Sequence, residues 1–448
     1  MSPPGRRQGD DRSAHEAGTP MPRIAEIAAR LQAYDPQALS AEAVGEFLAQ
    51  LVTPVRETES VGIFDALGRV LAADLVSPIS VPPHDNSAMD GYAFAGAQLA
   101  QGALRLQMMG TALAGKAWPG QVQAGQCVKI MTGAVMPAGL DTVVPQELVS
   151  LEGEVVSVPA GVLQPGDNRR CAGEDLMAGE PALRAGERLG PAACGLVASL
   201  GIAQVEVFRR LKVAYFSTGD EILSMGEPPR EGAVYDSNRY TVHGLLTRLG
   251  CEVIDLGVVR DQPALLEQAF RGAAARADAI ITSGGVSVGE ADYTKAMMKK
   301  LGDVAFWRIA MRPGRPMAVG RIPAGEASGA GEAVLFGLPG NPVAVMVTFL
   351  AFVRPALLRM MGARQTAPVL LKARSAEAMR KKPGRTEYQR GIVSRSADGG
   401  LEVRTTGNQG SGVLSSMVQA NGLIVLHHAQ GHVAAGDAVD VMMFEGAI

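Results

Sequence analysis

Small polar and acidic residues form the segment Ser217-Thr218-Gly219-Asp220-Glu221, directly after the apolar run at residues 213–216. Backbone amides and the hydroxyl of Thr218 can bind phosphate oxygens where a helix begins. The Glu221 carboxylate is a hard oxygen ligand of the kind that Mg²⁺ takes beside phosphate oxygens. An N-capped turn between a strand and a helix uses the same residue types, so the segment alone allows a binding role or a purely structural one.

A second segment, residues 282–292 with the sequence TSGGVSVGEAD, is rich in glycine and serine. Glycines let backbone amides approach an anion closely, and serine hydroxyls add donors. The segment is neither a Walker A loop nor a dinucleotide-binding fingerprint. It contains G-x-S-x-G at residues 285–289, which makes a serine hydrolase with Ser287 as nucleophile the alternative function. The hydrolase is less favoured because every downstream histidine lies beyond residue 426 and no HGGG motif occurs.

Three arginines, Arg308, Arg312 and Arg315, lie close together on a stretch that two prolines stiffen. A guanidinium stays charged and binds phosphates and other tetrahedral oxyanions through several donors. A solvated basic turn is the alternative. Residues 336–342, with the sequence FGLPGNP, end an apolar run and open a helix, so their backbone donors are expected at the same edge of the sheet.

Further polar residues occur in segments that allow a bland interpretation as well. Asp90 could be a metal ligand, although Asp-Gly-Tyr is typical of a turn. Arg170 and Asp175 lie in a mixed-charge loop of a kind that is usually solvated. His427, His428 and His432 resemble a metal cluster, but no carboxylate or cysteine pair lies nearby in the sequence. We therefore interpret the histidines as surface or interface residues.

Strands and helices alternate from about residue 207 to residue 358. Apolar runs at 213–216, 253–256, 279–282 and 334–336 are separated by helical patterns at 238–249, 264–277 and 291–301. This order predicts an α/β domain with a mainly parallel sheet and helices on both faces. Ligands bind such sheets at the carboxyl ends of the strands, which is where the segments described above would lie.

The flanking regions have other patterns. Val44, Phe47, Leu48 and Leu51 predict an amphipathic helix, and residues 186–201 predict another helix that packs against it. Residues 62–161 are cut by glycine and proline into short apolar runs, which predicts a β-rich region. Five short strands after residue 362 predict a final small barrel or sandwich. They are expected at 368–373, 388–393, 401–405, 422–426 and 438–444.

Composition limits the classes of function. The 448 residues suggest roughly two to four domains. A formal charge of −3 argues against a large nucleic-acid surface. Four scattered cysteines without a CxxC pair predict neither a disulfide framework nor a zinc site and favour a cytoplasmic location. We expect no membrane span, since no apolar run reaches about 18 residues and the longest, residues 342–353, predicts a buried helix.

The order of the motifs resembles the molybdopterin molybdenumtransferase family, which completes molybdenum-cofactor synthesis. The resemblance runs from about Ile24 to the C-terminus. It rests on seven motifs: DNSAMDGYA at 85–93, MTGA at 131–134, GED at 173–175, STGDE at 217–221, YDSNR at 235–239, SGGVSVGEADYTK at 283–295 and LPGNPV at 338–343.

The resemblance implies an elongated homodimer whose subunits have four domains. They would be a helical connecting domain (23–60 and 176–205), a β-rich domain (61–175), the α/β molybdopterin-binding domain (206–361) and a C-terminal β-barrel (362–448). Residues 1–22 are expected to be a disordered tail. The active cleft would join the α/β domain of one subunit to the β-rich domain of the other. A molybdopterin adenylyltransferase would be a further partner.

The resemblance also implies a reaction, the insertion of molybdate into adenylylated molybdopterin with release of AMP, assisted by Mg²⁺. Asp90 and Glu221 become the expected metal or catalytic carboxylates, with Thr132, Arg170 and Asp175 beside them. The expected substrate-binding residues are Ser217, Thr218, Asp261, Ser283, Gly284, Gly285, Ser287, Asp292, Arg308, Arg312, Arg315, Pro339 and Pro342.

One departure from the family concerns the three arginines, which replace lysines typical of the family. Arginine keeps the charge but presents a planar fork of donors, so the contacts to molybdate are expected to differ. Two other functions remain as alternatives. The hydrolase would use Ser287 as its nucleophile, and a non-catalytic scaffold would have the same architecture without turnover. The retained carboxylates favour the enzyme.

Overall fold

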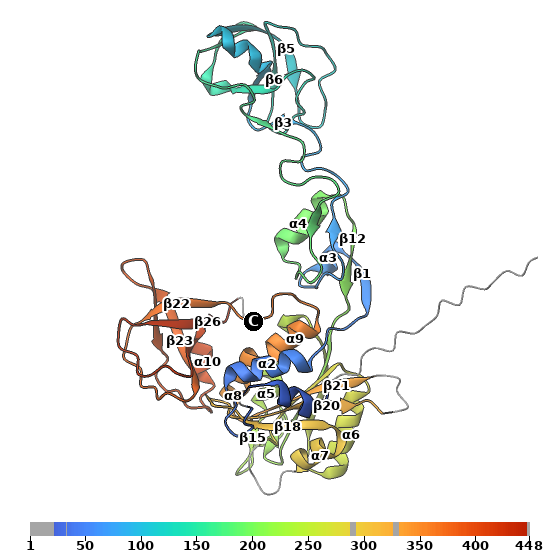
Figure 1. Ribbon diagram of the computed structural model, residues 1–448, viewed down its shortest axis with the longest axis vertical. Coiled ribbons are helices and arrows are strands. Elements are labelled where there is room, and N and C mark those ends of the chain that lie inside the picture. Colours follow the sequence, from blue (N-terminus) through green and yellow to red (C-terminus); the bar gives the residue numbers. More distant parts are fainter. Residues whose placement is uncertain (1–21, 33, 287–292, 326–330, 446–448) are drawn as a thin grey trace, which may run out of the picture. The chain divides into compact units, whose positions relative to one another are not determined.

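The computed structural model describes residues 22–32, 34–286, 293–325 and 331–445 (Figure 1). The chain divides into two compact units. One contains the residues up to 55, residues 210–361 and the C-terminal residues from 366, and the other contains residues 56–209 and 362–365. Each unit has its own sheets and hydrophobic cores.

The first unit is built on a six-stranded sheet with the order β16-β13-β17-β21-β20-β18. The strands are β13 (Lys212–Thr218), β16 (Glu252–Val259), β17 (Ala279–Ser283), β18 (Asp303–Arg308), β20 (Pro316–Pro323) and β21 (Glu332–Leu338). The first four in the sheet are parallel, which confirms the predicted α/β domain. The antiparallel strands β18 and β20 were not predicted. They flank the arginine-rich segment and hold it at the edge of the domain.

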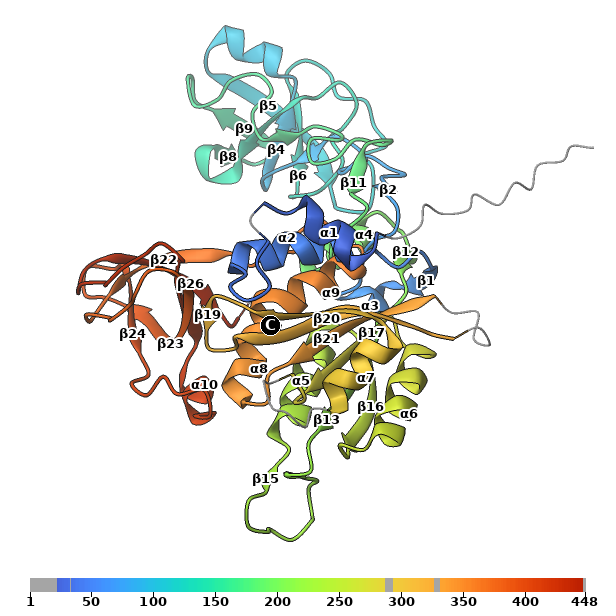
Figure 2. The same ribbon diagram turned by 60° about the horizontal axis from the view of Figure 1, so that its bottom comes forward.

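Helices cover both faces of this sheet (Figure 2). They are α5 (Ser237–Leu249), α6 (Pro263–Ala274) and α7 (Tyr293–Leu301), and short strands β14 (Ile222–Leu223) and β15 (Val234–Tyr235) precede α5. Helices α6 and α7 pack on one face through Phe216, Phe270 and Leu335, and α5 packs on the other through Val242 and Leu246. The rings of Phe216 and Phe270 meet edge to face at 5.1 Å, a favourable aromatic geometry.

A long apolar helix runs from Pro342 to Met360 as α8 (Pro342–Thr348), a π-helical turn η3 (Phe349–Val353) and α9 (Arg354–Met360). It is longer than the predicted run, and by length and composition it would suffice for a membrane span. The expectation that no run is long enough was therefore wrong. Of its most apolar window, 78% is buried inside the protein, against β21, α5 and α2 (Ala41–Leu51). This burial agrees with the prediction of a core helix.

The N-terminal helices α1 (Ile24–Arg30) and α2 pack on the α/β domain. The ring of Phe47 meets Trp307 at 4.8 Å, and the indole N–H of Trp307 donates to the Tyr34 hydroxyl at 2.9 Å. The apolar face of α2 packs against α9 and the π-helical turn. Packing of α2 against the helix at 186–201 stays a prediction, because that helix belongs to the other compact unit.

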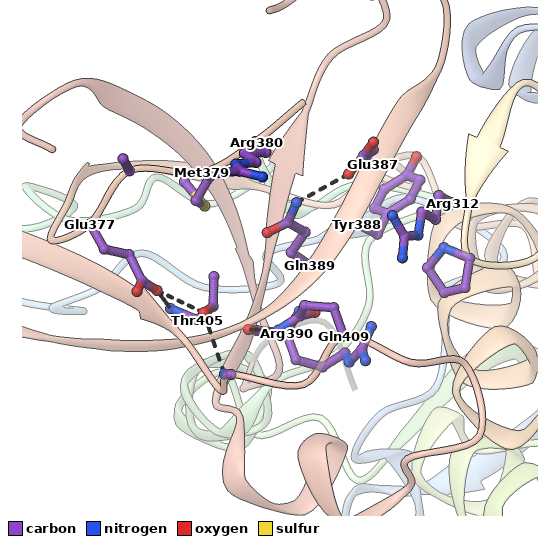
Figure 3. A pocket seen from close by; sticks show the side chains of 13 residues that line it. Arg312, Glu377, Met379, Arg380, Glu387, Tyr388, Gln389, Arg390, Thr405 and Gln409 are labelled. Atoms are coloured by element: carbon purple, nitrogen blue, oxygen red, sulfur yellow. Dashed lines mark hydrogen bonds between the residues drawn. The ribbon is translucent and has the colours of Figure 1, made fainter. Parts of the chain in front are cut away.

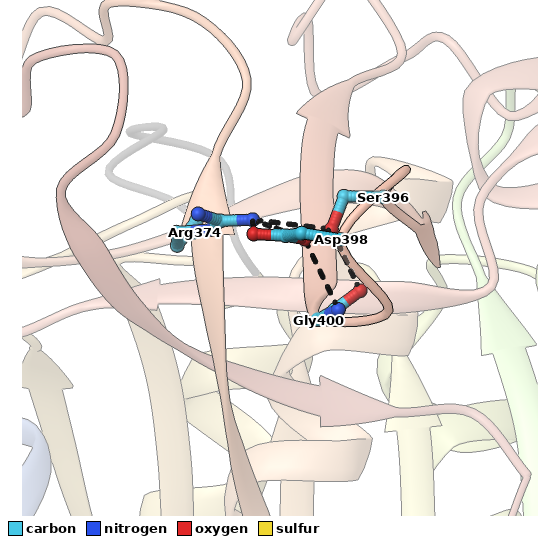
Figure 4. A network of polar contacts seen from close by, with 4 residues as sticks. All are labelled: Arg374, Ser396, Asp398 and Gly400. Atoms are coloured by element: carbon cyan, nitrogen blue, oxygen red, sulfur yellow. Dashed lines mark hydrogen bonds and ion pairs between the residues drawn. The ribbon is translucent and has the colours of Figure 1, made fainter.

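The C-terminal strands close into a five-stranded barrel, since β23 pairs with both β24 and β25. They are β22 (Leu370–Ser375), β23 (Thr386–Arg395), β24 (Leu401–Thr405), β25 (Gly422–Leu426) and β26 (Ala438–Met443). Helix α10 (Ser415–Gln419) lies between β24 and β25 in the sequence. The predicted strands are confirmed, and the fold is a barrel. Arg374, Ser396 and Asp398 hold the β23–β24 turn (Figure 4). Strand β19 (Met311–Arg312) pairs with β23 and ties the arginine segment to the barrel.

The second unit contains a six-stranded sheet with the order β7-β4-β6-β5-β9-β8. Its strands are β4 (Gly91–Phe94), β5 (Leu104–Ala112), β6 (Gln126–Ile130), β7 (Thr142–Pro145), β8 (Ser150–Glu152) and β9 (Val155–Val158), with single turns η1 (Gly96–Gln101) and η2 (Gln146–Leu148). Apolar side chains fill a core on each face, around Phe94 and Val156 on one and Val128 and Val143 on the other. The predicted β-rich region is confirmed.

A smaller module completes the second unit. It contains β1 (Thr58–Gly62), α3 (Ile63–Ala66), β2 (Leu75–Val76), β11 (Pro181–Leu183), α4 (Pro191–Ser199) and β12 (Gln204–Phe208). In the same unit, β3 (Asn86–Ser87) pairs with β10 (Arg169–Arg170). Its core contains Leu71, Leu189, Val197 and Val205. The helix predicted within 186–201 is therefore confirmed as α4, although it is shorter.

Candidate functional site

Three of the predicted segments meet at the carboxyl edge of the α/β sheet. Strand register places Ser217 of β13 beside Ser283 of β17, and Ser283 beside Leu338 of β21. The chain segments after these residues carry Glu221, the glycine-rich loop and the Pro339–Gly340 turn. Parallel strands end together, so the sheet places segments far apart in the sequence side by side.

These segments line a cavity of about 700 Å³. Among its walls are the predicted residues Glu221, Gly284, Gly285, Arg312, Arg315 and Pro339. Four further lining residues come from the barrel, where no site residue was predicted: Arg385, Gln409, Gly410 and Ser411. The sequence offered no local signal for them, because the barrel reaches the cavity through long-range contacts: β19 pairs with β23, and the Val343 N–H donates to the Ser411 carbonyl oxygen at 3.1 Å.

Gly284 and Gly285 lie too close to their neighbours for a side chain. Gly284 has a φ of +91°, and a Cβ there would lie 2.4 Å from the Thr218 carbonyl oxygen. Gly285 has a φ of +64°, and a Cβ there would lie 2.4 Å from Thr294 Cβ. Glycine is needed at both positions, and the backbone of these two residues at the cavity wall can approach a ligand.

Hydroxyl groups beneath this loop form a buried network. The Tyr215 hydroxyl lies 2.8 Å from Ser217 Oγ and 2.7 Å from Ser283 Oγ, and burial raises the pKa of Tyr215. Ser217 and Ser283 are only 1% and 2% exposed. Their hydroxyls therefore link the ends of two strands instead of lining the cavity.

A second polar network stabilises the same edge. Thr218 Oγ1 lies 3.3 Å from Thr294 Oγ1, and Thr294 donates to Asp261 Oδ1 at 3.1 Å. The Asp261 N–H donates to Asp220 Oδ1 at 3.4 Å. Thr218 and Asp261 are thus brought together, as predicted for one site, because both bond to the hydroxyl of Thr294. Neither residue is among the lining residues of the cavity.

Of the three predicted arginines, Arg312 and Arg315 line the cavity and Arg308 does not. Neither Arg312 nor Arg315 has a carboxylate partner among the residues that the structure describes. Arg385, by contrast, forms an ion pair with Glu387, with Nη2 2.7 Å from Oε1. Two positive charges that form no direct ion pair with a described carboxylate, at a cavity wall, favour an anionic ligand. Pro342 begins α8 and lies outside the lining.

Asp90 and Thr132 meet in the second unit. The backbone N–H and the hydroxyl of Thr132 both donate to Asp90 Oδ1, each at 2.7 Å. These two hydrogen bonds, with the charge of Lys129 as a minor contribution, lower the pKa of Asp90. Asp90 is exposed and stays ionised at neutral pH.

The neighbouring loops are joined by hydrogen bonds. Arg170 pairs with Asn86 across β10 and β3, and the Asp175 N–H donates to the Val81 carbonyl oxygen at 3.0 Å. The side chains of Arg170 and Asp175 are exposed. Ser287 and Asp292, the remaining predicted residues, lie outside the residues that the structure describes.

The donor set for a divalent ion is small. Within the described residues, no group of three or more histidine, cysteine, aspartate or glutamate side chains could hold a metal. Mg²⁺ commonly binds through one or two carboxylates together with substrate phosphates, and Glu221 at the cavity wall fits that mode. The C-terminal histidines do have a carboxylate nearby, because His427 Nε2 lies 2.7 Å from Asp440 Oδ2. Lys372 also pairs with Asp440, which makes this a surface ion-pair cluster.

Models of protein families match three parts of the chain. Residues 39–201 match the MoeA N-terminal region (domain I and II), residues 214–359 match a probable molybdopterin binding domain, and residues 372–444 match the MoeA C-terminal region (domain IV). The first match contains the β-rich sheet, the second corresponds to the α/β domain, and the third corresponds to the C-terminal barrel.

Curated relatives extend over nearly the whole chain. A molybdopterin molybdenumtransferase of Haemophilus influenzae is 42% identical over 404 residues, which cover 90% of this chain and 98% of the relative. A protein of the same name from Nostoc sp. is 36% identical over 394 residues, covering 86% and 89%. The crystal structure of a molybdopterin biosynthesis moeA protein from Pyrococcus horikoshii OT3 matches with a TM-score of 0.77 at 28% identity, covering 91% of this chain and all of that one.

The fold and the matched domains define a multidomain protein whose α/β domain is of the molybdopterin-binding class. The serine hydrolase has no support among these relatives. The extent and identity of the matches show more: the chain belongs to the molybdopterin molybdenumtransferase family.

Proposed function

We propose that this protein is a molybdopterin molybdenumtransferase that inserts molybdate into adenylylated molybdopterin and releases AMP. The observation that carries the proposal is the composition of the 700 Å³ cavity. It combines the glycine backbone of Gly284 and Gly285, the Glu221 carboxylate and the arginines Arg312 and Arg315. Glycine backbone suits a phosphate, a carboxylate suits a divalent ion, and arginine suits a tetrahedral oxyanion.

Both proposed substrates are anions, so the cavity must offset their repulsion. Molybdate is a tetrahedral dianion, and the adenylylated pterin carries a pyrophosphate. Arg312 and Arg315 supply positive charge, and neither forms an ion pair with a described carboxylate. Holding both reactants in one cavity replaces a collision between two dilute anions by an encounter of bound groups. The same charges stabilise the negative charge that develops as the phosphoanhydride breaks.

We propose that Mg²⁺ binds at Glu221. Bound there, the ion would neutralise charge on the pyrophosphate oxygens. Asp90, whose charged form the hydrogen bonds from Thr132 favour, is the second proposed carboxylate ligand, and the family resemblance assigns it to the partner subunit. The supply of adenylylated substrate by a molybdopterin adenylyltransferase and a cytoplasmic location belong to the same proposal.

We further propose that the protein is a homodimer. The side chain of Phe64 on α3 is fully exposed, and that of Leu67 is 56% exposed. Helix α4 is apolar all round, yet only Val197 is buried within the subunit. Such a helix is normally covered on several sides, so these surfaces support a protein partner at this module.

The experiment combines the purified protein with adenylylated molybdopterin, molybdate and Mg²⁺. The proposal predicts release of AMP that depends on molybdate, and a product that activates a cofactor-free molybdoenzyme. No AMP and no activation would reject the proposed reaction. A fluorophosphonate probe that labels Ser287 would instead support the hydrolase.

Glu221→Gln tests the proposed metal ligand. It removes the charge and keeps the shape, so the rate of AMP release is expected to fall at least about a hundredfold at a limiting Mg²⁺ concentration. Glu231→Gln is the matched control, because Glu231 is exposed and does not line the cavity. Equal rates in the wild type and Glu221→Gln at all Mg²⁺ concentrations would remove Glu221 from the metal site.

A further inference from the structure

The loop at residues 408–411 forms a wall between two hollows of the first unit. Gln409, Gly410 and Ser411 line the 700 Å³ cavity. On the barrel side lies a smaller hollow of about 260 Å³, lined by residues that include Arg390 and Gln409. Figure 3 shows the side chains of Arg390 and Gln409 next to each other at this smaller hollow. The position of the loop therefore sets the shape of one wall of the cavity.

Arg390 on β23 holds this loop from the barrel side. Its side chain is 1% exposed, and Nη2 donates to the carbonyl oxygens of Asn408 at 3.3 Å and Gly410 at 2.9 Å. Its Nε donates to Ser416 Oγ at 3.0 Å. The backbone of Arg390 is bonded to the same loop, since its N–H donates to Gln409 Oε1 at 2.8 Å and its C=O accepts from Gln409 Nε2 at 3.1 Å.

These bonds determine which way two peptide groups face. The peptides of the loop are trans, and the C=O and N–H of a trans peptide point in opposite directions. With the carbonyls of Asn408 and Gly410 turned toward Arg390, the N–H groups of Gln409 and Ser411 point away from it. Within the described residues neither N–H has an acceptor. Both belong to residues that line the larger cavity, where Arg312 and Arg315 also lie.

We propose that Arg390 is a positioning residue that turns the backbone N–H groups of Gln409 and Ser411 toward the oxyanion in the cavity. The inference rests on the proposed function, which places molybdate there. Arg390 itself does not line that cavity. Burial and the nearby charge of Arg312 lower the pKa of Arg390 to about 10, so the guanidinium remains protonated at neutral pH and keeps its donors. Oriented amides beside positive charges are well suited to an oxyanion.

Two variants separate positioning from charge. Arg390→Lys keeps the charge but loses the planar fork that reaches two carbonyls and Ser416, and Arg390→Met loses both. Molybdate binding to the intact protein is measured by titration calorimetry, together with the KM values for molybdate and for adenylylated molybdopterin. We expect both variants to raise the Kd and the KM for molybdate about tenfold, the worth of one or two hydrogen bonds to an anion. The KM for the pterin substrate is expected to stay within about twofold.

Lys381→Met is the matched control. Lys381 is 2% exposed in the same barrel, and its Nζ donates to the carbonyl oxygens of Lys382, His428 and Gln430, away from both hollows. It should lower the Tm as Arg390→Met does and leave the molybdate Kd unchanged. If Arg390→Lys binds molybdate as tightly as the wild type, or if Lys381→Met loses as much molybdate affinity as Arg390→Lys, the inference is overturned and the proposed function is not. Absence of molybdate binding to the wild type overturns the proposed oxyanion cavity and the inference with it.

Discussion

The carboxylates of the proposed site differ in their surroundings. Asp90 accepts two short hydrogen bonds from Thr132, which favour its charged form, while Glu221 stands at the wall of a cavity with two arginines. Because its pKa is lowered, Asp90 is fully charged at every pH above the ordinary carboxyl pKa. It is protonated only when the pH falls through the lowered pKa. Asp90 can therefore offer an anionic oxygen to a cation at neutral pH.

Thr132→Val tests this arrangement. The backbone N–H still donates, but the hydroxyl is lost, so the pKa of Asp90 should rise part of the way toward its ordinary value. An NMR titration of the Asp90 carboxyl carbon measures the shift. Asp90 stays ionised at pH 7 in either case, so any loss of activity there reflects altered geometry. Thr111→Val, at an exposed position on β5, is the control. An unshifted Asp90 titration in Thr132→Val would contradict the assigned cause.

Residue types were readable from the sequence, but their contacts were not. The carboxylate at 221, the glycines at 284 and 285, and the arginines at 312 and 315 were all predicted, and the structure places them around one cavity. The hydroxyls of Ser217 and Ser283 were also predicted as ligands, and they are buried against Tyr215. A serine after a strand looks the same in sequence whether its side chain faces a cavity or the core.

At the scale of elements, the apolar runs predicted the parallel strands because three of them, at 213–216, 279–282 and 334–336, are buried on both faces. Strands β18 and β20 escaped prediction because their sequences contain charged and small residues and flank the arginine segment. The barrel contribution escaped for another reason. Arg385 and residues 409–411 lie far along the chain from both Arg312 and Glu221. Long-range contacts bring them together: β19 pairs with β23, and the Val343 N–H donates to the Ser411 carbonyl oxygen.

The glycine-rich loop allows a paired prediction at this scale. Gly284→Ala places a Cβ at 2.4 Å from the Thr218 carbonyl oxygen at a φ of +91°, so the loop must shift and the KM for adenylylated molybdopterin should rise at least about tenfold. Gly244→Ala lies within α5, where a Cβ meets nothing within 4 Å, and should raise the free energy of unfolding by about 0.5–1 kcal/mol. Chemical denaturation and steady-state kinetics measure the two effects. An unchanged KM in Gly284→Ala would exclude the loop from substrate binding.

At the scale of the whole molecule, the apolar surface of α3 and α4 is the feature that a single chain leaves unexplained. Phe64→Ser should weaken the proposed dimer at least tenfold, because it removes a fully exposed aromatic ring from the proposed contact. Light scattering during size-exclusion chromatography gives the mass in solution. Val418→Ser, at an 84% exposed position on α10, is the matched control. A dimer that persists in Phe64→Ser at the wild-type Kd would place the interface elsewhere.

The central claim is that the cavity between the α/β domain and the barrel binds the oxyanion. Anomalous X-ray diffraction from crystals soaked in tungstate, an electron-dense analogue of molybdate, tests it most directly. The account predicts one strong anomalous peak in the cavity, within contact distance of Arg312 or Arg315 and of the residues 409–411. A peak bound elsewhere on the protein, with the cavity empty at saturating tungstate, would contradict it.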